Sequence, residues 1–213
     1  MNHFHLYNQQ VFQEYLLCDK ENPGMLSYPL LVSPEYINPS GKILCIGQET
    51  NTWGNHFLKD VSVDDLEDLY ASFLKKGATN RPYWKFIKEV TADSSLESIV
   101  WSNLLLCGKR DTLGTPEVSE NLFHLSEEYL YHLYKECYPC HVMILSSPHS
   151  VYANLIQRFF ENIDCHMSDA LSSRQPVLIN EDKKVIWTYH PKYLAMSKQT
   201  EKVKTICKNY ISK

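Results

Sequence analysis

Three polar side chains with the chemistry of a hydrolytic site come at or near the ends of short apolar runs in the sequence: Glu49, Asn103 and His190. A carboxylate can orient water and stabilise a developing cation, and a histidine can stabilise a leaving group. An asparagine amide presents a donor and an acceptor together, so it can read the edge of a base. Together they predict a hydrolytic site that recognises a base.

The elements that must position these residues alternate along the chain. Short apolar runs predict buried strands at 43–47, 98–105, 141–146 and 184–189. Helices are predicted over about 9–18, 63–76, 82–92, 119–136, 149–161 and 197–211. This alternation predicts an α/β fold, with a central, mostly parallel four-stranded sheet in a three-layer αβα arrangement. Ligands bind at the carboxyl ends of such strands, where the polar residues fall.

Length and composition are those of one globular domain spanning 1–213. Of the 213 residues, 44% are hydrophobic and 22% charged, so a large core can form without disulfides. No apolar run approaches the ~20 residues needed to cross a bilayer. The first ten residues lack the basic and apolar regions of a signal peptide. We therefore expect a cytoplasmic monomer that makes no membrane contact.

Charge is distributed unevenly along the chain. The net charge is −4, yet residues 183–213 carry eight lysines and a single acid, Glu201. A basic segment on an acidic body is typical of a protein that contacts nucleic acid. A terminal helix with a solvated lysine face is the alternative.

Three short motifs, taken in order, resemble those of the uracil-DNA glycosylase superfamily. Segment 46–49, Ile-Gly-Gln-Glu, is similar to the start of the family motif Gly-Gln-Asp-Pro-Tyr-His. Asn103 is similar to the asparagine that reads the pyrimidine edge. Segment 190–194, His-Pro-Lys-Tyr-Leu, resembles the motif His-Pro-Ser-Pro-Leu. The resemblance covers residues 43–194.

This resemblance implies a monofunctional DNA glycosylase, a hydrolase of base-excision repair with neither metal nor organic cofactor. It would cleave the N-glycosidic bond of a flipped-out uracil or modified pyrimidine in double- or single-stranded DNA. Glu49 would act on water and the sugar, and His190 on the leaving base. Gln48 and Asn103 would read the base, and Leu194 would fill the vacated stack as a wedge.

Further contacts are expected from residue type alone. Trp53 and Tyr193 could stack on a base. Ser147 could bind a phosphate or cap the following helix. Lys192 and Lys198 could contact phosphates.

The sequence also departs from the family motifs. Glu49 is one methylene longer than the family's aspartate. Asn51 stands where the family keeps a tyrosine that blocks the thymine methyl, which predicts a pocket open to a larger 5-substituent. Lys192 and Tyr193 replace Ser-Pro.

Each candidate residue also has a structural interpretation. Glu49 could be a solvated loop acid, His190 a turn residue, Asn103 a strand-end hydrogen-bonding group and Trp53 part of the core. For the whole chain, the alternatives are a non-catalytic binder of damaged or single-stranded nucleic acid and a hydrolase of free nucleosides or nucleotides. The Cys-x-x-Cys pair at Cys137 and Cys140 lacks a second pair at zinc-site spacing, so no metal is expected.

Overall fold

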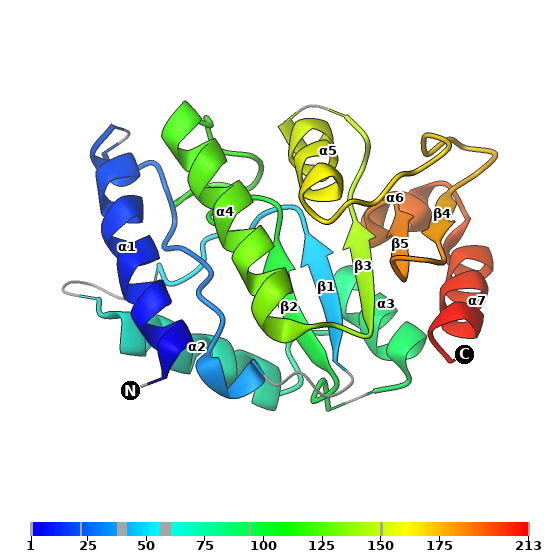
Figure 1. Ribbon diagram of the computed structural model, residues 1–213, viewed down its shortest axis with the longest axis horizontal. Helices are drawn as coiled ribbons and strands as arrows, with labels where there is room; N and C mark the ends of the chain where they lie inside the picture. Colours follow the sequence, from blue (N-terminus) through cyan, green and yellow to red (C-terminus); the bar gives the residue numbers. More distant parts are fainter. Residues whose placement is uncertain are drawn as a thin grey trace.

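The computed structural model describes residues 2–21, 23–37, 42–55, 61–93, 95–149 and 151–212. Its centre is a five-stranded sheet with the order β2-β1-β3-β5-β4 (Figure 1). The strands are β1 (Ile43–Gly47), β2 (Ile99–Asn103), β3 (His141–Leu145), β4 (Val177–Asn180) and β5 (Val185–Thr188). β2, β1, β3 and β5 are parallel, and β4 pairs antiparallel with β5. The α/β fold and the mostly parallel sheet are thus confirmed.

The prediction of four strands was wrong by one, because the apolar run of β4, Val177 to Ile179, is only three residues long. β1 and β2 are buried along their whole length, as expected for strands covered on both faces. In β4 only Leu178 is fully buried, and the strand lies at the sheet edge.

The helices are α1 (His3–Glu21), α2 (Val63–Lys75), α3 (Pro82–Thr91), α4 (Glu120–Cys137), α5 (Val151–Asn162), α6 (Pro191–Met196) and α7 (Thr200–Ile211), with a 3₁₀ turn, η1, at Pro34–Tyr36. Local interactions explain where several of these helices begin. Ser62 and Asp65 form a reciprocal capping box at α2, Ser119 caps α4 through the N–H of Leu122, and Pro82 occupies the first turn of α3.

Two helix predictions needed correction. The helix predicted over 9–18 extends over His3–Glu21. The basic helix predicted over 197–211 begins only at Thr200, after a separate short helix, α6. Lys198 lies between the two helices with a φ of 57°, which interrupts the helical path.

Crossover direction places the helices on the two faces of the sheet. From β1 the chain passes through α2 and α3 to β2 on one side, then through α4 to β3 on the other side of β1. Right-handed crossovers in opposite directions put their helices on opposite faces. Helix α4 accordingly packs against α5, and also against α1, whereas α3 packs against α6 and α7 (Figure 1).

An extended segment near the amino terminus lies along the chain that follows β2. The N–H of Ser27 donates to the Gly108 carbonyl (2.9 Å) and that of Leu30 to the Leu106 carbonyl (2.8 Å). In return the Gly108 N–H donates to Ser27 Oγ (2.9 Å). Residues 26–30 therefore brace the segment that leaves the carboxyl end of β2.

Among the described helices, none is both long and apolar enough to cross a bilayer.

Candidate functional site

The sheet has a topological switch point between β1 and β3, where the following connections leave in opposite directions. Gln48, just after β1, crosses this point, and its Nε2 donates to Ser146 Oγ, just after β3 (3.3 Å). Ser146 is fully buried. Open α/β sheets bind ligands in the crevice at this place.

Glu49 is partly buried beside this switch point and is held by a side chain from α5. The Tyr152 hydroxyl donates to Glu49 Oε2. Tyr152 also lies 2.6 Å from Thr115 Oγ1, and since its single hydrogen is given to Glu49, Thr115 is the donor in that contact. Burial raises the pKa of Glu49, and the Tyr152 hydrogen bond opposes that rise. The group is thus a desolvated carboxylate in a fixed position.

Removal of the Tyr152 hydroxyl should change how Glu49 titrates. In Tyr152→Phe the hydrogen bond that lowers the Glu49 pKa is lost, while burial still raises it. If base release needs ionised Glu49, the acid limb of kcat/KM against pH should move to higher pH. Tyr138→Phe is the control, because Tyr138 is 70% exposed. An unmoved acid limb in Tyr152→Phe would mean that the activity does not depend on Glu49 ionisation.

Asn103 ends β2 and is 4% exposed. In the amide orientation that gives both its nitrogen and its oxygen a hydrogen-bond partner, the nitrogen donates to the Ser102 carbonyl (3.0 Å) and the oxygen accepts from the Thr50 N–H (3.3 Å). The side chain lies over Gly47, where an added β-carbon would overlap it. The amide thus links the ends of β1 and β2.

His190 follows β5 and stacks on Tyr83, with ring centroids 5.8 Å apart and planes inclined by 24°. Its Nδ1 accepts from the Lys192 N–H (3.2 Å), which caps α6. Burial lowers the pKa of His190 to about 4, and the positive charge of Lys192 adds to the effect. At neutral pH the imidazole is therefore uncharged, with its proton on Nε2 as the remaining donor.

Two buried hydroxyls beside Asn103 have no hydrogen-bond partner within the described part of the chain: Thr50 Oγ1 and Tyr83 OH. The Tyr83 hydroxyl borders the same face of Gly47 as the Asn103 amide. Buried polar groups are nearly always paired, so each of these hydroxyls is a candidate partner for a polar ligand or water.

The structure therefore brings Gln48, Glu49, Asn103 and His190 to the carboxyl ends of the parallel strands. Sequence reasoning missed the groups that connect them: Tyr83, Thr115 and Tyr152. No motif marks these residues, because each reaches the site from a distant part of the chain.

Two residues predicted to contact DNA or a base are buried in this structure. Leu194 is 0% exposed and lies one turn from buried Pro191 on α6, on the face that packs inward, so a role as a wedge would require α6 to move. Trp53 is 8% exposed and packs edge-on against Phe73 and Trp101, so its structural interpretation holds.

The remaining candidates lie at or near the surface. Asn51, Lys192, Tyr193 and Lys198 are exposed, and Tyr193 packs on Tyr189 with ring centroids 4.6 Å apart. The Ser147 hydroxyl accepts from the His149 N–H (3.1 Å). That bond is local, as expected for a serine that shapes the turn before α5.

No protein-family model matches the chain, and no curated protein matches it at a significant level.

Proposed function

We propose that the chain is a monofunctional DNA glycosylase that hydrolyses the N-glycosidic bond of a uracil or modified pyrimidine. The observation that carries this proposal is the set of unpaired polar groups beside Asn103, flanked by a desolvated carboxylate and a neutral imidazole. A planar base with donors and acceptors on its edge matches such groups.

Glu49 and His190 act on opposite sides of the bond that breaks. As the bond from C1′ to the base nitrogen breaks, positive charge grows on the sugar and negative charge on the base. Ionised Glu49 stabilises the sugar and accepts a proton from the water that adds to C1′. The Nε2–H of His190 donates to a carbonyl oxygen of the departing base. A neutral donor suits this step, because it remains protonated across the neutral pH range.

Base reading falls to Asn103 and its neighbours. Its two hydrogen bonds to the backbone use one hydrogen and one lone pair, so one of each remains for a base. The hydroxyls of Thr50 and Tyr83 add further polar contacts. Because Asn103 is 4% exposed, base entry requires the segment after β1 to move outward.

The direct test is a product assay on oligonucleotides carrying a panel of altered bases, in single and double strands. We expect abasic sites at the positions of a subset of the pyrimidines. Asn51 is exposed rather than a steric wall, so 5-hydroxymethyl pyrimidines belong in the panel. Abasic sites from none of the substrates would overturn the proposal, and release from free nucleosides alone would indicate a nucleoside hydrolase.

A non-catalytic binder of damaged or single-stranded nucleic acid is the second candidate. It is favoured by the closed state of Asn103 and by burial of Leu194, since both reduce access for a flipped base. Binding without base release in the same assay would select it.

If the protein binds DNA, its affinity should fall with increasing salt, and particular lysines should account for this dependence. Part of the basic segment is already neutralised, because Lys204 pairs with Glu89 and Glu201. Lys192, in the first turn of α6, and Lys198, just after this helix, remain exposed. Their joint change to glutamine should flatten the slope of log K against log salt by up to about 1.8, at about 0.9 for each phosphate contact.

The matched control changes Lys75 and Lys76 to glutamine. It removes the same charge from the end of α2, where Lys75 pairs with Glu35 (2.9 Å). Equal flattening in both double variants would mean that net charge, rather than the α6 region, governs binding.

A further inference from the structure

Metal-binding side chains gather at two places among the described residues, each bringing three ligand atoms within 4.8 Å of one another. One group is His3, His132 and Glu136, and the other is His5, Asp64 and Glu67. The two groups differ in how many of their ligand atoms already make hydrogen bonds within the protein.

The second group is saturated by protein contacts. His5 Nδ1 lies 2.9 Å from Glu67 Oε2, and its Nε2 lies 2.9 Å from the Gln9 amide. Glu67 Oε1 accepts from the Asn8 amide (2.6 Å). A cation here would have to displace several short hydrogen bonds.

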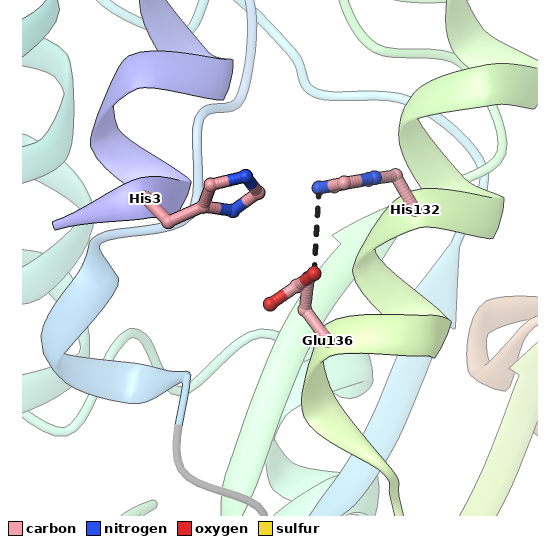
Figure 2. A group of neighbouring side chains, drawn as sticks. All are labelled: His3, His132 and Glu136. Atoms are coloured by element: carbon pink, nitrogen blue, oxygen red, sulfur yellow. Dashed lines mark ion pairs between the residues drawn. The ribbon is translucent and has the colours of Figure 1, made fainter.

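The first group includes a buried ligand atom that makes no hydrogen bond. His132 Nε2 is buried and has no hydrogen-bond partner in the described structure. It lies 3.8 Å from Glu136 Oε1, too far for a hydrogen bond. Figure 2 shows the rings of His3 and His132 turned toward each other across the space between α1 and α4, with the Glu136 carboxylate beneath.

Helix geometry fixes two of these three side chains. His132 and Glu136 are four residues apart on α4, so they project from one face in successive turns. His3 comes from the first turn of α1, which packs against α4.

We propose that His3, His132 and Glu136 bind a zinc-class divalent cation that joins the first turn of α1 to α4. Two imidazoles and one carboxylate form a known zinc ligand set. Neighbouring ligands of a tetrahedral zinc site lie about 3.3 Å apart, so small side-chain rotations from the observed spacing complete it. His3 is exposed, so a fourth position remains open to water. This proposal departs from the sequence expectation of no metal, and it is independent of the proposed function.

The test titrates the metal-free full chain with Zn²⁺ against a chromogenic chelator. We expect one tight equivalent for the wild type and at least about tenfold weaker binding in His3→Gln and in Glu136→Gln. His3→Gln alters an exposed residue, so we expect this variant to keep its fold. Zn²⁺ binding should also slow amide exchange in the first turns of α1 in the wild type, but not in His3→Gln or Glu136→Gln.

The matched control is His124→Gln. His124 lies on the same helix and also faces glutamates, Glu120 at 3.8 Å and Glu127 at 3.7 Å, but belongs to neither three-residue group. Zn²⁺ binding should be unchanged in this variant. Equal loss in His124→Gln, loss in His5→Gln instead of His3→Gln, or no tight binding by the wild type would each overturn the proposal. So would a thiolate charge-transfer band with Co²⁺, which would place the cation on cysteine.

Discussion

Glu49→Gln should slow base release by about two to three orders of magnitude, the usual loss when a preorganised electrostatic group is removed from an active site. The substitution keeps the shape of the side chain and an oxygen that can accept from Tyr152, but it removes the negative charge. DNA affinity should change little. Single-turnover rates with the preferred oligonucleotide measure the effect.

The same substitution should leave the fold as stable as before, or more so. Burial raises the pKa of Glu49, so at neutral pH the folded state holds a charge that it disfavours relative to the unfolded chain. Glutamine removes that cost. Glu117→Gln, at an exposed residue of the loop that contains Thr115, is the matched control and should leave rate and stability unchanged. A wild-type rate in Glu49→Gln would remove Glu49 from the mechanism.

Gly108→Ala should lower the free energy of unfolding by more than about 3 kcal/mol, at or beyond the upper range for overpacked sites. An added β-carbon would overlap the Thr50 carbonyl oxygen and lie 2.8 Å from its carbonyl carbon. Both are backbone atoms, so rotation of a side chain cannot relieve the overlap. The segment that carries Glu49 and Thr50 would have to move away from the end of β2.

Urea unfolding measures this loss, with the slope checked for two-state behaviour. Gly114→Ala is the comparison, because a β-carbon there meets no atom within 4 Å and only the positive φ of 102° is penalised. If Gly108→Ala is no less stable than Gly114→Ala, the close approach between residues 50 and 108 does not exist in solution.

The sheet could be predicted because buried parallel strands are apolar over their whole length. The run 43–47 reads directly as β1, and the polar residues after each run then fall at one edge. β4 could not be found in this way, because its apolar run, Val177 to Ile179, has only three residues, fewer than the four to eight that indicate a buried strand. Its pairing with β5 is visible only in the folded chain.

The site could be predicted only where the chemistry lies next to a strand. Glu49 and His190 are adjacent to strand ends, but Tyr152 is 103 residues from the carboxylate it contacts. Leu194 is a different case, because here a local motif was present but did not indicate where the side chain lies. Its motif position suggested an exposed wedge, whereas the short helix α6 turns it into the core. Orientation on a single helical turn is set by tertiary packing, which no local pattern records.

The brace formed by residues 26–30 along the segment after β2 has a consequence for the order of folding. Ser27 and Gly108 are 81 residues apart, so this contact closes a long loop. During synthesis the early segment leaves the ribosome well before its partner does. It must remain unpaired until α2, α3 and β2 have emerged, and non-local contacts of this kind form slowly. The carboxyl edge of the sheet is therefore expected to be completed late, after the strands that support it have already paired.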